Sequence, residues 1–116
     1  MIETTLCNHL KALNNKIPVF MEIPDHPPQR FFLLENTGGN RENEIQYNTF
    51  ALQTYGVSVT DAAHMALLGT NQMLRAVEHD KVAAVKLNSG PYNFPDITRK
   101  RHRYQSVFEI THYELE

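Results

Sequence analysis

Helical and extended patterns follow one another along this chain in an order that leaves few possible folds. A helix is predicted where apolar residues recur every three or four positions, and a strand where they alternate with polar ones. The predicted order is helix, three strands, helix and two strands, over residues 2–15, 17–23, 30–37, 44–55, 59–78, 82–87 and 97–113. Grouped strands with short links favour antiparallel pairing. The sequence therefore predicts an α+β fold, in which an antiparallel sheet of four to five strands carries both helices on one face.

Local signals indicate where some of these elements begin and end. Ser58 and Asp61 resemble a capping box at the start of the second helix, although Asp replaces the usual Glu. Gly69 interrupts the apolar stripe of that helix, which indicates close packing on a neighbouring element. Residues 38–43 (GGNREN) are rich in turn-forming types, so we expect them to form the turn of a β-hairpin. Residues 88–96 contain two prolines and are expected to form a loop.

Composition favours one globular domain. The chain has 116 residues, of which 41% are hydrophobic, and it lacks the continuous apolar run of about 20 residues that a membrane span needs. We expect a single domain over residues 1–114 and interpret residues 115–116 as a cloning scar. The first residues are polar and acidic, unlike a secretory signal, so we expect an intracellular protein without a membrane partner.

A basic strip near the end of the chain contrasts with an otherwise acidic composition. It consists of Arg99, Lys100, Arg101 and Arg103, and the rest of the chain holds seven basic and 13 acidic residues. A straight strand over residues 97–113 would measure roughly 55 Å, whereas a compact domain of this size is only about 35 Å across. We therefore expect the beginning of this strand, with its basic strip, to bend or to project from the domain.

Three interpretations of the basic strip remain open. It forms a docking surface for another protein, a solvated strand end, or a contact for single-stranded nucleic acid that uses the nearby Tyr92 and Phe94. The negative net charge argues against nucleic acid, because proteins that bind it usually present a wider basic face. Docking is our preferred interpretation.

The sequence contains no recognisable catalytic or metal-binding motif. Its six histidines include no HExxH pattern, and Cys7 is its single cysteine. Gly38 and Gly39 are not followed by the Lys-Ser/Thr pair or the helix of a phosphate-binding loop. We therefore expect neither an enzyme nor a bound metal or cofactor.

Taken together, several segments resemble the small tail-terminator proteins of tailed phages and prophages of Gram-positive bacteria, which are also described as tail-completion or head–tail joining proteins. The resemblance covers most of the chain. It rests on the opening helix and on residues 17–24 (IPVFMEIP), 32–39 (FLLENTGG), 41–43 (REN), 50–55 (FALQTY), 85–89 (VKLNS), 92–94 (YNF) and 104–113 (YQSVFEITHY).

This resemblance implies a structural protein of the virion that has no active-site residues. Such proteins form a ring, typically a hexamer, which caps the tail tube, stops its growth and offers a surface to the head-completion protein. The implied partners are further copies of the chain, the tail tube protein and the head-completion protein. The implied location is the head-proximal end of the tail, after assembly in the host cytoplasm. A head-side connector or stopper subunit is the alternative in the same setting.

The candidate interface residues belong to two segments. They are Gly38, Gly39, Arg41 and Glu42 in the expected hairpin turn, and Tyr92, Phe94, Arg99, Lys100, Arg101 and Arg103 around the basic strip. Their assignment rests on chain length and charge and not on the family pattern.

Overall fold

The computed structural model describes residues 1–113, so the expected cloning scar at residues 115–116 lies outside the described residues. The described elements, in chain order, are α1 (Ile2–Leu13), β1 (Val19–Phe20), β2 (Phe31–Glu42), β3 (Ile45–Gly56), α2 (Val59–Leu74), the short 3-10 helix η1 (Arg75–Glu78), β4 (Val82–Asn93) and β5 (His102–Tyr113). This order confirms the predicted α+β fold.

The five strands form one sheet in the order β1-β2-β3-β5-β4. The pairs β2–β3, β3–β5 and β5–β4 are antiparallel, as predicted, but β1 runs parallel to β2, with Val19 opposite Phe32. The sheet is therefore mixed. The connection through residues 21–30 is long enough to return the chain to the end of the sheet from which β1 started. Strand β2 can therefore run in the same direction as β1.

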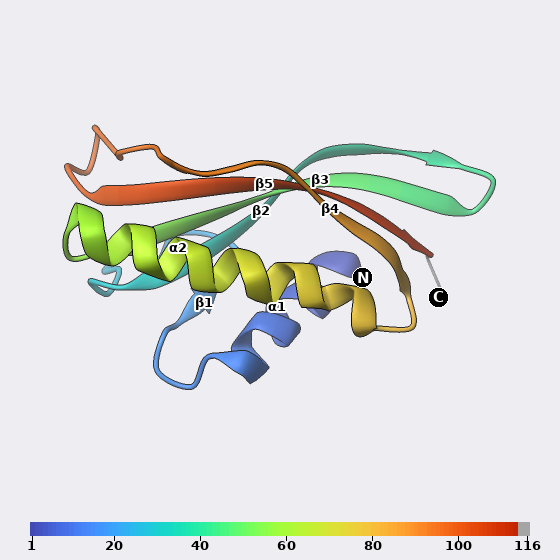
Figure 1. Ribbon diagram of the computed structural model, residues 1–116, viewed down its shortest axis with the longest axis horizontal. Coiled ribbons are helices and arrows are strands. Elements are labelled where there is room, and N and C mark those ends of the chain that lie inside the picture. Colours follow the sequence, from blue (N-terminus) through green and yellow to red (C-terminus); the bar gives the residue numbers. More distant parts are fainter. Residues whose placement is uncertain (114–116) are drawn as a thin grey trace.

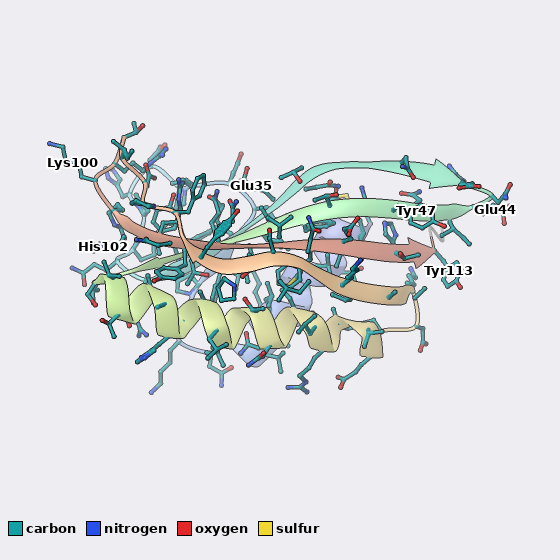
Figure 2. The ribbon with its side chains drawn as sticks, turned by 45° about the horizontal axis from the view of Figure 1, so that its top comes forward. Glu35, Glu44, Tyr47, Lys100, His102 and Tyr113 are labelled. Carbon is teal, nitrogen blue, oxygen red and sulfur yellow. The ribbon has the colours of Figure 1, made fainter. Side chains whose placement is uncertain are left out.

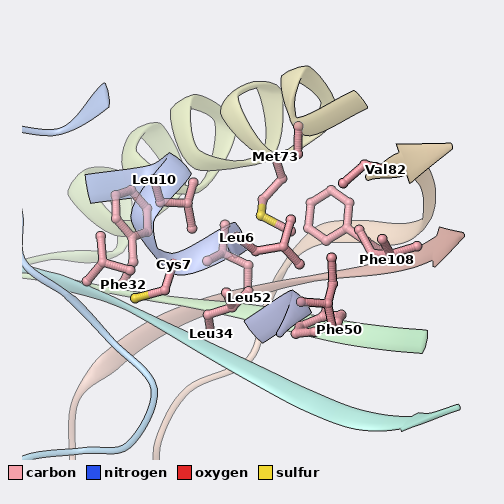
Figure 3. Close-up of a cluster of buried hydrophobic side chains, with 14 of the residues drawn as sticks. Leu6, Cys7, Leu10, Phe32, Leu34, Phe50, Leu52, Met73, Val82 and Phe108 are labelled. Atoms are coloured by element: carbon pink, nitrogen blue, oxygen red, sulfur yellow. The ribbon is translucent and has the colours of Figure 1, made fainter. Parts of the chain in front are cut away.

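Both helices lie on the same face of the sheet, which confirms the predicted layers (Figure 1). The main core fills the space between helices and sheet, where Phe50 of β3 and Phe108 of β5 pair across the strands and are fully buried. Figure 3 shows the side chains that surround them from α1, α2 and the strands: Leu6, Cys7, Leu10, Phe32, Leu34, Leu52, Met73 and Val82.

The second helix begins and packs as its sequence predicts. The Ser58 hydroxyl accepts a hydrogen bond of 3.0 Å from the backbone N–H of Asp61, which satisfies one of the free donors of the first turn. Gly69 is buried in the middle of α2. A methyl group built at this position would lie 2.6 Å from a ring carbon of Phe32, so a side chain here would displace the core. The close packing that Gly69 indicated is confirmed.

The predicted β-hairpin between the second and third strands is confirmed, but its turn does not lie at residues 38–43 as expected. Strand β2 continues through both glycines to Glu42, and the chain reverses at Asn43 and Glu44, whose φ angles are 52° and 70°. Two successive positive φ values suit a tight two-residue hairpin. Gly38 instead follows a β-bulge, where the pairing register shifts and its φ of 153° favours glycine.

Two further predicted boundaries are wrong. Residues 88–93 are the second half of β4 and not a loop; this strand accommodates its glycine and proline through shifts in register and a cis peptide between Gly90 and Pro91. Strand β5 begins at His102 and not at residue 97. The chain between the two strands is a compact turn, and so the basic strip does not form an extended arm.

The domain is elongated, with principal extents of 43 × 25 × 25 Å. The hairpin end of the sheet extends beyond the helices, and the β4–β5 connection lies at the opposite end (Figure 1).

Candidate functional site

The face of the sheet opposite the helices is only partly covered. Residues 21–30 cross one corner of it, where Phe20 and Ile23 pack against a small cluster of Phe31, Leu33 and Tyr55. No helix described by the structure lies over the remainder, which we call the open face (Figure 1). Strand register places on it Glu35, Ala51, Gln53, Ser89, Tyr92, Gln105, Val107 and Glu109.

A ladder of polar side chains crosses the middle of the open face. The amide of Gln53 on β3 donates to the Gln105 carbonyl oxygen at 2.9 Å, and the Gln105 amide donates to the Tyr92 hydroxyl at 2.7 Å. Three strands are thus tied together by side chains. Sequence reasoning missed this ladder, since β3 and β5 are not adjacent in the sequence and neither glutamine forms part of a motif. The alternation of the strands could at most have placed both glutamines on the same face.

The basic strip lies at and after a tight turn between β4 and β5. Asp96 and Arg101 face each other in an isolated bridge with two backbone hydrogen bonds of 3.0 Å. The chain turns between them, and Lys100 adopts a positive φ of 53°. The Asp96 carboxylate also accepts a hydrogen bond from the Arg99 backbone N–H at 3.1 Å. The turn is therefore held at both ends.

Arg101 does not form part of a solvated strip. Its guanidinium donates to the carbonyl oxygens of Pro28 and Gln29 at 3.0 and 2.7 Å. It also lies over the rings of Phe31 and Tyr55, within 6 Å of both centroids. Arg101 therefore fastens residues 28–29 to the sheet and closes the small cluster on that face.

Arg103 is also turned inward. Its guanidinium lies 4.4 Å from the Phe94 ring centroid and donates to the Phe94 carbonyl at 2.7 Å and to the Tyr55 hydroxyl at 3.2 Å. One of its nitrogens is 3.8 Å from the Asp96 carboxylate, and only 15% of its side chain is exposed. The interpretation of the basic strip as a solvated strand end is thus wrong for Arg101 and Arg103. Arg99, half-exposed beside Asp96, and the exposed Lys100 remain accessible.

Asp96 is the buried centre of this arrangement. Besides its ion pairs, it accepts a hydrogen bond of 2.8 Å from the Tyr55 hydroxyl. Burial raises the pKa of the Asp96 carboxyl, but hydrogen bonds from Arg99 and Tyr55 and the charge of Arg103 outweigh it, so the pKa falls below the ordinary 3.8. Burial and the hydrogen bond to Asp96 raise the pKa of Tyr55 above 10.0. The ionised carboxylate and the neutral phenol are therefore the stable pair at neutral pH.

This lowered pKa predicts a loss of stability in acid. The contribution of ionised Asp96 is fully present above the ordinary pKa of 3.8 and is lost as the pH falls through that value toward the lower pKa of the folded state. Urea unfolding midpoints measured from pH 6 to pH 3 should therefore fall more steeply for the wild type than for Asp96→Asn, which has no carboxyl at this position. Parallel pH profiles for the two proteins would contradict the assignment.

The two groups of candidate interface residues lie at opposite ends of the sheet. Figure 2 shows Lys100 and His102 at one end, and Glu44, Tyr47 and Tyr113 at the other. Gly38, Gly39, Arg41 and Glu42 belong to the hairpin end and are exposed. Tyr92 and Phe94, whose rings meet edge to face at 6.1 Å, precede the basic turn. The structure does not bring the two groups together within one copy.

Three of the six histidines, His9, His79 and His112, make side-chain hydrogen bonds, in two separate places. His79, directly after η1, lies against His9 of α1 with their ring nitrogens 3.0 Å apart, and His112 lies 2.6 Å from the Asn48 side-chain oxygen. Within residues 1–113, no three His, Cys, Asp or Glu side chains are grouped so that they could hold a metal ion. No helix in this part of the chain is long and apolar enough to cross a membrane.

Neither a protein-family model nor a curated protein sequence matches this chain. The structure contributes to a functional proposal through the geometry of the open face and of the two ends of the sheet.

Proposed function

We propose that this chain is a structural subunit of a phage or prophage virion that acts as a tail terminator. In this role, several copies form a closed ring on the tail tube, stop its growth and bind the head-completion protein. The subunit performs no chemical step. Its function is geometric, because the ring presents a terminal surface that lacks the next binding site of the tube.

The open face, with unlike groups at its two ends, is the observation that carries this proposal. A ring of identical subunits needs two different surfaces on each copy, so that one copy binds the next in a single direction. The hairpin end presents Glu42 and Glu44 beside Arg41, whereas the β4–β5 turn presents Arg99 and Lys100. Such an arrangement supports contacts between copies more directly than it supports binding to nucleic acid, since Arg101 and Arg103 are engaged within the domain.

A null mutation in the phage or prophage that encodes the chain tests the proposal. Without a terminator, tube subunits continue to add, so we expect tails of abnormal and variable length that are not joined to heads. Electron microscopy of induced lysates measures tail length and the fraction of joined particles. Expression of the chain from a plasmid should restore both.

The same experiment separates the proposal from its alternative. Tails of normal length together with heads that fail to join would contradict a terminator and favour a head-side connector or stopper. Complete particles with normal tails in the null strain would contradict both functions.

A further inference from the structure

The open face is hollowed near the hairpin end of the sheet. A groove of about 390 Å³ lies there, with walls that include Tyr47 and Thr49 of β3, Lys86 of β4 and Glu109 and Thr111 of β5. These five residues lie on the open face according to the strand register. The groove is therefore a concave surface on the part of the sheet that the helices leave uncovered.

The surroundings of this groove are acidic. Glu35, Glu42 and Glu109 lie on the open face, and Lys86, directly opposite Glu109, is the basic residue beside them. Within residues 1–113, none of these three carboxylates is part of an ion pair. The walls of the groove hold one charge of each sign, and the excess negative charge comes from Glu35 and Glu42 on the surrounding face, which favours a basic occupant.

The opposite end of the molecule carries charges that suit this groove. The turn at residues 97–100 is narrow, and the bridge between Asp96 and Arg101 holds its base. It carries the charges of Arg99 and Lys100, together with Ile97, whose side chain is unusually exposed at 83%. The turn therefore offers an exposed apolar side chain and two basic ones to a neighbouring molecule.

We propose that the turn at residues 97–100 of one copy occupies the groove of the next copy. Lys100 then lies near Glu109, and Ile97 contacts the exposed ring of Tyr47. The turn and the groove are at opposite ends of a domain 43 Å long, so the contact is head-to-tail and repeats in one direction. This inference rests on the proposed function, since a terminator must assemble with copies of itself, and it names the two surfaces that would meet.

Charge reversal at both surfaces tests the contact. Sedimentation velocity over a concentration series should show that the wild type self-associates and that added salt weakens the association, since the paired charges are exposed. Lys100→Glu and Glu109→Lys should each weaken it at least ~10-fold, because like charges then face each other. The chain that carries both substitutions should recover most of the affinity, because the pair is restored with opposite sign.

Matched reversals elsewhere on the surface provide the control. Lys16→Glu and Glu22→Lys reverse one positive and one negative charge, as the test substitutions do, but at exposed positions outside the turn and the groove. They should leave self-association unchanged. Circular dichroism confirms that every variant folds.

Three outcomes would overturn the proposed contact. They are a wild type that stays monomeric at its highest soluble concentration, single reversals that associate as the wild type does, and a double reversal that is no better than the singles. None of these contradicts the terminator function, which the tail lengths of the null strain test separately.

Discussion

Replacing Asp96 by alanine is expected to destabilise the folded chain by about 2–4 kcal/mol. The carboxylate is 4% exposed and accepts hydrogen bonds from the Tyr55 hydroxyl and the Arg99 backbone N–H, with Arg103 beside it. Its removal leaves the buried Tyr55 phenol without its acceptor and the largely buried Arg103 guanidinium without its counter-charge, and an unpaired buried charge is costly. Chemical denaturation followed by circular dichroism measures the change in the free energy of unfolding.

Two variants separate the buried carboxylate from a general effect of charge. Asp96→Asn keeps an acceptor for Tyr55 but loses the charge, so its destabilisation should be smaller than that of the alanine variant. Asp80→Ala removes an exposed carboxylate and should change stability by less than about 0.5 kcal/mol. If Asp96→Ala unfolds at the same denaturant concentration as Asp80→Ala, the carboxylate does not support the β4–β5 turn.

The parts of the fold that the sequence predicts well are those with local physical causes. A polar residue that caps a helix accepts a hydrogen bond from a backbone N–H three residues away, and Ser58 accepts one from Asp61. Helical spacing places apolar side chains on one stripe, so both helices could be assigned and laid on the same face of the sheet. Gly69 is also a local signal, because glycine within a helix costs about 1 kcal/mol and is retained where a side chain would not fit.

The boundaries that the sequence predicts poorly depend on partners far along the chain. Gly38 and Gly39 are turn-forming types, yet pairing with Thr49 and Asn48 keeps them in a strand beyond a bulge. Gly90 and Pro91 lie in the edge strand β4, where an irregular ladder tolerates a residue without a donor. In each case, tertiary pairing outweighs local preference.

The basic strip shows the same limit at the candidate site. Charge and exposure are uncorrelated for its members: Lys100 is exposed, whereas Arg103 is packed on Phe94 and paired with Tyr55. The two partners lie nine and 48 residues from Arg103, so a basic run alone cannot identify which cation is structural. The sequence around Asp96 does not indicate its structural role, because an aspartate after a proline is typical of any loop.

Replacing Gly69 by leucine is expected to destabilise the domain by about 1–2 kcal/mol. The first atom of any side chain at this position would lie 2.6 Å from the Phe32 ring and 3.0 Å from a methyl group of Leu52, both of which are buried in the core. Excess volume in a packed core costs about 1–3 kcal/mol or more. The gain of about 1 kcal/mol in helix propensity offsets only part of that cost.

A double-mutant cycle with Phe32→Ala tests whether this contact is the cause. Phe32→Ala alone should cost about 3–5 kcal/mol, because it leaves a cavity beneath α2. In the double variant the leucine can occupy part of that cavity, so the combined cost should be smaller than the sum of the single costs by at least about 1 kcal/mol. Gly69→Ala, which adds a single methyl group, should be less destabilising than Gly69→Leu. Additive costs in the cycle would contradict the packing of α2 on Phe32, and with it the layer arrangement that leaves the opposite face of the sheet open.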